Sequence, residues 1–383
     1  MKIVEVRPYA LNVGGRNHCL VKVALDSGAV GWGEAGLSHK ERAVGAMVDV
    51  LRPLFEGRDP RRRGALWQEA YRAGYFEGDR SLSAALSAVD IALHDALGRE
   101  LGVPVYELLG GAHRERVPVF PTIGSLDPAE ALEGAVRLAD DGWSVIRLMC
   151  VNPSEDDGVF EPLESVYRTA ALVRELRARI DPAVAIGVEF HHRLSVAETI
   201  AFGEAVPRGA LAFLEEPIRA ESPAAYGALR DRVGIPLAVG EEFISKWQFA
   251  QFFDAGVIDY ARVDVANAGG FTESMKIAAM AEARYVDVMP HNPLGTIGTA
   301  ATAHFALAVP NLSWIEYRGL PGDTLFPDDP VALTTTHRLE GQMLAVSDAP
   351  GLGVDVAEAR LNETLEPQVI PRLVRRDGSY TNW

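Results

Sequence analysis

Three glutamates spaced by 26 residues, Glu189, Glu215 and Glu241, are the strongest chemical signal in the sequence. Each follows a short apolar run: VAIGVEF, LAFLE and PLAVGEE. If these runs are neighbouring parallel strands, the three carboxylates meet at one end of a sheet. Carboxylates held together repel one another, so the group needs a cation. Oxygen ligands without a nearby cysteine favour Mg²⁺, with Mn²⁺ as the alternative, over zinc.

Other titratable residues end the apolar runs that follow. Asp264 ends YARVD, His291 ends DVMPH and Glu316 ends SWIE. An imidazole oriented by a carboxylate from the adjacent strand is suited to act as a general base. His191 comes two residues after Glu189, and side chains two apart on a strand point to the same face. We therefore expect Asp264 and His291 to form the base, and His191 to lie beside the metal ligands.

The elements that position these residues recur with a steady period after residue 111. The apolar runs are VPVF (117), WSVIRL (143), VAIGVEF (184), LAFLE (211), PLAVG (236), IDYARV (258), YVDVM (285) and LSWIE (312). Helical patterns separate them. Eight strands with intervening helices predict an α/β fold, a (β/α)₇β barrel that lacks the last helix of a TIM barrel. The active site of such a barrel lies at the C-terminal ends of its strands, where these acids stand.

The N-terminal region has a different pattern. Three strand-like runs, KIVEVRPYAL, CLVKVAL and AVGWGEA, precede amphipathic helical patterns at 40–55, 60–76 and 81–101. We therefore expect an α+β domain over 1–115, the barrel over 116–328 and a C-terminal segment over 329–383 that ends in a loose tail. GWGEAG (31–36) matches G-x-G-x-x-G, but it ends an antiparallel hairpin, so a nucleotide site is discounted.

Composition narrows the class of protein. The 383 residues are 48% hydrophobic and 23% charged, as in an ordinary globular protein, and the net charge is −16. An acidic chain does not favour nucleic acid or anionic membranes as partners. No apolar run approaches bilayer-spanning length, and the N-terminus lacks the pattern of a signal peptide. We expect a cytoplasmic protein in which Cys19 and Cys150 are reduced thiols.

Several motifs together resemble the mandelate racemase branch of the enolase superfamily over essentially the whole chain. They are GWGE (31–34), ALHDALGRELGVPVYELLGG (92–111), FLEEP (213–217), VGEE (239–242), NAGGFTESMKIAAMAEA (267–283), MPHNPLG (289–295) and PGLGV (350–354). The resemblance implies that the α+β domain, with the C-terminal segment, caps the barrel. It also implies that Glu189, Glu215 and Glu241 bind Mg²⁺, with Asp264 and His291 as base. A homo-oligomer acting on a small carboxylate, an acid sugar above all, is expected.

Enzymes of this superfamily remove the proton next to a carboxylate and give an ene-diolate, whose second negative charge a metal stabilises as a Lewis acid. Glu316, if protonated, could donate a hydrogen bond to an ene-diolate oxygen. Its alternative role is to hold a neighbouring lysine or to support the metal ligands.

The sequence departs from the family pattern at three places. Arg147 and Met149 stand where many relatives carry Lys-x-Lys. Arginine stays protonated, so Arg147 is expected to be an electrostatic partner of the enolate or of the metal carboxylates rather than a second base. Glu189 stands where aspartate is usual, and Glu242 stands where relatives often carry arginine or asparagine.

Dehydration of an acid sugar to a 2-keto-3-deoxy acid is the leading interpretation. Glu189-Phe190-His191 resembles the Asp-Phe-His arrangement of galactonate dehydratases, in which the histidine protonates the departing hydroxyl. The alternatives are a racemase or epimerase with His191 as second base, a cycloisomerase, and a catalytically silent barrel that serves as a scaffold or binds sugar acids. Two capping loops, Gly14–His18 and Tyr71–Arg80, are expected to select the substrate, and His192 is given no role.

Overall fold

The N-terminal domain is an antiparallel sheet with helices packed on it. The computed structural model describes residues 1–383 except 14, 319–332, 362, 368–371 and 383, so Gly14 of the first capping loop lies outside the described residues. Strands β1 (Ile3–Val13), β2 (Arg16–Leu25) and β3 (Val30–Ala35) pair in that order. Helices α1 (Glu41–Phe55), α2 (Arg63–Arg72), α3 (Arg80–Leu101) and α4 (Val105–Leu108) follow. Asp79 caps α3 by accepting from two backbone N–H groups of its first turn.

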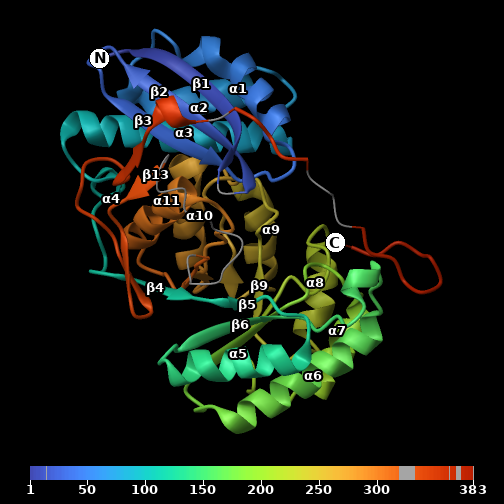
Figure 1. Ribbon diagram of the computed structural model, residues 1–383. Helices are drawn as coiled ribbons and strands as arrows, with labels where there is room; N and C mark the ends of the chain where they lie inside the picture. The colour runs from blue at the N-terminus through green and yellow to red at the C-terminus, as the bar shows by residue number, and fades with distance from the viewer. Residues whose placement is uncertain (14, 319–332, 362, 368–371, 383) are drawn as a thin grey trace.

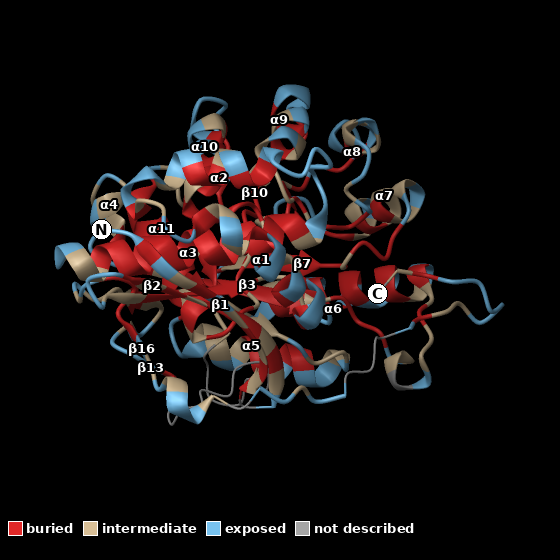
Figure 2. Cartoon of the chain, turned by 90° about the horizontal axis from the view of Figure 1, so that it is seen from above, coloured by how far each residue is buried: buried red, intermediate tan, exposed pale blue. Residues whose placement is uncertain are grey.

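Helix α3 packs unusually close to strand β3. Its residues 82–98 are all buried, and Figure 2 shows buried parts of the chain in red. A Cβ added to Gly31 would lie 2.2 Å from the carbonyl oxygen of Ala92, and one added to Gly33 would lie 1.9 Å from that of Ala88. Gly31 and Gly33 of GWGEAG therefore allow the close packing of α3 on β3.

Replacing Gly33 by alanine should lower the free energy of unfolding by about 1–3 kcal/mol, because α3 must move away from β3 to admit the methyl group. Gly64 in α2 is the matched control, since a Cβ there would meet nothing within 4 Å. Gly64→Ala should leave the stability unchanged or slightly higher. Urea denaturation of both variants measures the difference, and equal stabilities would contradict the packing argument.

The second domain is the expected barrel (Figure 1). Its parallel strands run in the order β5 to β11, and β12 pairs in parallel with β4 to close the ring. The strands are β4 (Val117–Phe120), β5 (Thr122–Ile123), β6 (Val145–Met149), β7 (Ala185–Glu189), β8 (Phe213–Glu215), β9 (Leu237–Val239), β10 (Tyr260–Ala261), β11 (Asp287–Val288) and β12 (Ile315–Glu316). The fold class predicted from the sequence is confirmed.

Helices connect the barrel strands and cover the outside of the sheet (Figure 1). They are α5 (Pro128–Asp140), α6 (Pro162–Arg179), α7 (Val196–Ala205), α8 (Pro223–Arg230), α9 (Lys246–Ala255), α10 (Gly270–Glu282) and α11 (Thr296–Ala308). Local sequence sets their starts. Ser195 and Glu198, for example, form a reciprocal capping box at the start of α7. Among the described residues, no helix is both long and apolar enough to cross a membrane.

The C-terminal segment contacts both domains. It contains β13 (Leu333–Thr335), β14 (Arg338–Glu340), β15 (Met343–Ala345) and β16 (Val354–Val356), and β15 pairs with barrel strand β4. Glu358 then forms an ion pair of 2.9 Å with Lys22 of the N-terminal sheet. The predicted boundary at 328/329 lies outside the described residues. In the C-terminal tail, Leu373 and Thr381 are buried, while residues 376–380 are exposed.

Candidate active site

The glutamates that opened the sequence analysis lie at the C-terminal ends of consecutive strands. Glu189 ends β7 and is paired in register with Glu215 at the end of β8. Glu241 follows β9 by two residues. Glu189 and Glu215 are fully buried, and the side chain of Glu241 is 12% exposed. The barrel therefore brings acids that are far apart in the sequence to one mouth.

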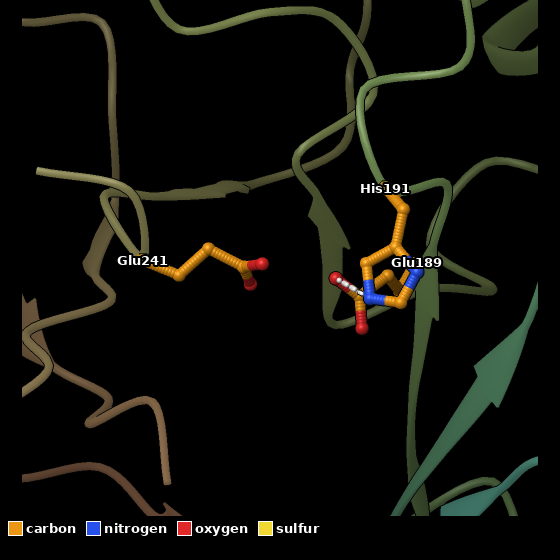
Figure 3. Close-up of side chains that lie close together, drawn as sticks. All are labelled: Glu189, His191 and Glu241. Carbon is orange, nitrogen blue, oxygen red and sulfur yellow. Dashed lines mark ion pairs between the residues drawn. The ribbon is translucent and has the colours of Figure 1, made fainter. Parts of the chain in front are cut away.

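A compact cluster forms from Glu189, Glu241 and His191. One ligand atom from each lies within 4.8 Å of the others, and Figure 3 shows the Glu241 carboxylate directed toward the other two. His191 Nε2 lies 3.0 Å from Glu189 Oε1 as an ion pair. Glu215, although predicted as a ligand, does not belong to this compact group.

The cluster fits a hard divalent cation. Both oxygens of Glu189 and Oε2 of Glu241 are buried, and none of them accepts a hydrogen bond of good geometry from the described residues. Burial and the charges of Glu189 and Glu215 raise the pKa of Glu241 well above its ordinary value. A cation would relieve both conditions. Because Mg²⁺ and Mn²⁺ prefer oxygen, the imidazole of His191 is better suited to act on a substrate than to bind the metal.

Glu215 is held by two arginines. Both of its oxygens accept hydrogen bonds from Nη1 of Arg147, at 2.9 and 3.0 Å, and Nε of Arg262 lies 2.5 Å from Oε1. The same Nη1 of Arg147 lies 2.9 Å from Oε2 of Glu189. Arg147 is thus an electrostatic partner of the carboxylates, which was one of its two expected roles. As a metal ligand, Glu215 would share its charge with these guanidinium groups.

Glu316 lies among three arginines. Its oxygens contact Nη2 of Arg147 at 2.6 Å, Nη2 of Arg262 at 2.5 Å and Nε of Arg318 at 3.0 Å. Burial raises the pKa of Glu316, but the arginines outweigh burial and hold it well below the ordinary value. The carboxylate has no proton to donate, so the structure does not support the expected donor role. Its position fits the alternative, which is to support the metal ligands through the arginines.

Asp264 and His291 form a hydrogen-bonded pair. Nδ1 of His291 lies 2.9 Å from Oδ2 of Asp264. Asp264 is itself fixed, because its oxygens accept from the backbone N–H of Ala266 at 2.8 Å and the amide of Asn267 at 2.9 Å. The other ring nitrogen, Nε2, lies 4.0 Å from Oε2 of Glu241. In the tautomer that donates Nδ1–H to Asp264, Nε2 is the ring nitrogen that faces the carboxylate cluster.

Comparison with known proteins identifies the family of the chain. The family model for the mandelate racemase / muconate lactonizing enzyme N-terminal domain matches residues 3–110. The enolase C-terminal domain-like model matches residues 130–360. The chain belongs to the mandelate racemase subgroup of the enolase superfamily.

Members of this subgroup that resemble the chain are known by sequence and by structure. It is 35% identical to D-galactonate dehydratases from Ralstonia nicotianae, covering 100% of both chains, and from Verminephrobacter eiseniae, covering 95% of this chain and 94% of the relative. An enolase from Agrobacterium radiobacter, solved with bound sodium and L-malate, aligns at a TM-score of 0.89, with 28% identity and 100% of both chains covered.

One histidine pair at the mouth departs from regular strand geometry. His191 and His192 both have positive φ, 46° and 62°, so the alternation expected of a strand stops at Glu189. His191 nevertheless faces the cluster. Such left-handed backbone in residues other than glycine is strained and tends to occur at functional sites. The turn is held by a 2.7 Å hydrogen bond from the His192 N–H to the Glu216 carbonyl.

Glu242, which the sequence left unexplained, contacts both His192 of the barrel and Arg80 of the capping domain. Nδ1 of His192 lies 3.1 Å from the Glu242 carboxylate. The backbone carbonyl of Glu242 accepts from Arg80 of the capping domain at 2.7 Å. Through Arg80, Glu242 therefore connects the second capping loop to the barrel mouth.

Arg262 is the site residue that the sequence analysis missed. It is fully buried in the barrel and contacts two of the predicted site acids. The sequence YARVD contained a signal for it. Arg262 is a charged residue in an apolar run and lies two residues before Asp264, so the two side chains should point to the same side of the strand.

Proposed function

We propose that the protein is a Mg²⁺-dependent dehydratase that converts an aldonate-type acid sugar into a 2-keto-3-deoxy acid and water. The observation that carries this proposal is the placement of two imidazoles at one carboxylate cluster. His291 approaches Glu241 from the end of β11, and His191 contacts Glu189 from the end of β7. The names of the relatives at 35% identity, D-galactonate dehydratases, support this substrate class.

The residues have separate tasks in this reaction. Glu189 and Glu241, with Glu215, would hold the metal, which supplies Lewis-acid stabilisation of the substrate carboxylate when bound. His291 Nε2 removes the α-proton, and the electrons of that C–H bond move into the carboxylate to give an ene-diolate. Asp264 keeps the imidazole in the tautomer that can accept this proton.

Elimination completes the reaction. The ene-diolate collapses and breaks the bond to the β-hydroxyl, which leaves as water after His191 donates a proton. The resulting enol tautomerises to the 2-keto-3-deoxy acid. The arginines around Glu316 hold the pKa of this carboxyl well below its ordinary value, which leaves the two histidines as the proton carriers of the site.

His191→Ala should separate proton removal from dehydration. Without the general acid, keto-acid formation should fall by about 10² to 10⁴, while α-proton exchange with solvent continues. Following deuterium wash-in and keto-acid formation in one reaction, after an acid-sugar library has given a substrate, measures both. His192→Ala is the matched control, because the neighbouring imidazole contacts Glu242 instead of the cluster. Equal loss of exchange and dehydration in the His191 variant would contradict its role as acid.

Isomerisation is the second candidate function. The same two imidazoles could act as bases on opposite faces of the substrate, and a 3,6-anhydro-D-galactonate cycloisomerase from Zobellia galactanivorans aligns at a TM-score of 0.82 with 28% identity, covering 94% of this chain and 100% of that one. Wild-type product decides between the candidates. An inverted acid carrying one solvent deuterium, without keto acid, would replace dehydration by epimerisation.

A further inference from the structure

The β-ladder does not reach the residue proposed as the base. Strand β11 ends at Val288, and its pairing with β10 stops at Ala261 and Val288. His291 lies three residues farther along the chain. Between them, Met289 still donates to the Ala261 carbonyl at 2.9 Å, but Pro290 has no N–H to donate. Beyond Met289, a long backbone hydrogen bond of 3.4 Å reaches the Pro290 carbonyl from the Glu316 N–H, and side chains supply the shorter contacts to this segment.

Arg262 supplies these contacts from the adjacent strand. Its Nη1 donates to the carbonyl oxygens of Met289 at 3.1 Å and Pro290 at 3.0 Å, the two residues directly before His291. Its Nη2 lies 2.5 Å from Oε2 of Glu316. That same oxygen accepts from the backbone N–H of Asn292 at 3.4 Å, directly after His291.

The side chain of Arg262 is itself held in place by its surroundings. It is fully buried, and its Nε lies 2.5 Å from Glu215 while Nη2 contacts Glu316. A planar guanidinium can contact two carboxylates and two carbonyls at once, which the single ammonium of lysine cannot. Glu215 ends β8, which pairs with β9, the strand before Glu241. The Arg262 side chain therefore links these carboxylates to the segment that carries His291.

We propose that Arg262 is a positioning residue for His291. Asp264 sets the rotation of the imidazole ring, and Arg262, together with Glu316, sets where its backbone stands relative to the carboxylate cluster. This inference rests on the proposed function in that it takes His291 as the base. Its geometric part, the immobilisation of residues 289–292, does not depend on the reaction.

The test compares Arg262→Gln and Arg262→Lys with wild type. A displacement of the base by about 1 Å should lower kcat for α-proton exchange by about 10²-fold. KM should change little, since substrate binding does not use Arg262. The lysine variant keeps the charge between Glu215 and Glu316 and should recover part of kcat. Amide hydrogen exchange, followed by mass spectrometry on the peptide containing residues 286–295, should be faster in the glutamine variant.

Arg177→Gln is the matched control. Arg177, on α6, also donates to backbone carbonyls, those of Val184 at 2.9 Å and Ala210 at 3.1 Å, but these residues precede strands β7 and β8 at the opposite end of the barrel. Its loss should lower thermal stability without changing kcat or amide exchange at 286–295. If both arginine variants lost kcat equally, the effect of Arg262 would be general loss of stability and the inference would fail.

Other outcomes are also decisive. Wild-type kcat and wild-type amide exchange in Arg262→Gln would overturn the inference. If that variant does not fold, Arg262→Lys carries the test, and wild-type kcat in it would overturn the inference as well. Absence of α-proton exchange in the wild-type enzyme with every acid sugar would count against the proposed function instead, while faster amide exchange in the variant would still support the positioning role.

Discussion

Replacing His291 by asparagine should lower exchange of the substrate α-proton with solvent deuterium by at least about 10²- to 10⁴-fold. Nδ1 of the His291 imidazole is hydrogen-bonded to Asp264, and Nε2 faces the carboxylate cluster. Asparagine keeps a polar side chain of similar reach but cannot accept the proton. Nuclear magnetic resonance of the substrate in deuterated solvent measures the rate. Dehydration should fall with exchange, because it follows proton removal.

Asp264→Asn provides the graded comparison. The ring of His291 would lose the carboxylate that orients it and stabilises its charged form, so exchange should fall while the base remains present. Magnesium binding should persist in both variants, because neither residue belongs to the compact cluster of Glu189, His191 and Glu241. Undiminished exchange in His291→Asn would place the base elsewhere in the site.

Removal of divalent metal should abolish turnover, and addition of Mg²⁺ should restore it. Both oxygens of Glu189 and Oε2 of Glu241 are buried without a hydrogen bond of good geometry from the described residues, although Arg147 and His191 form ion pairs with Glu189. Mg²⁺ at a hundred times its Kd should also stabilise the fold by about 2.7 kcal/mol, since it binds only the folded chain. Thermal unfolding with and without Mg²⁺ measures this effect independently of activity.

Glu241→Gln should remove most of this response to Mg²⁺. The metal-free variant should be at least as stable as the metal-free wild type, because a buried carboxyl beside Glu189 and Glu215 is replaced by a neutral amide. Glu242→Gln is the adjacent control, since that side chain faces His192 and Arg80 and should leave the Mg²⁺ response intact. Full activity of the chelated wild-type enzyme would refute the metal-centre assignment.

The sequence alone predicted the barrel and placed acids and histidines at its mouth, although it missed Arg262. Apolar runs with a steady period define strands, and the residue that ends each strand of such a barrel must face the same mouth. For this reason Glu189, Glu215 and Glu241 could be placed together without a structure. The pairing of Asp264 with His291 followed from the same rule, because their strands are neighbours.

Only the tertiary structure decided how these groups share charge. Arg147 and Glu316 are 169 positions apart in the sequence, and Arg262 and Glu316 are 54 apart, so no local pattern indicates that they meet. The choice of partners depends on side-chain reach inside the barrel. Glu316 therefore accepts from arginines instead of donating, and Glu215 contacts two guanidinium groups.

Backbone conformation at the mouth was equally a tertiary result. Strand alternation gave the correct side for His191, but the residue has a left-handed φ of 46° that alternation does not describe. The turn is held from outside, by the Glu216 carbonyl and by the side chain of Asn382, which donates to the His192 carbonyl. Strain of this kind persists only where distant parts of the chain hold it, and here the neighbouring strand and the C-terminal segment do so.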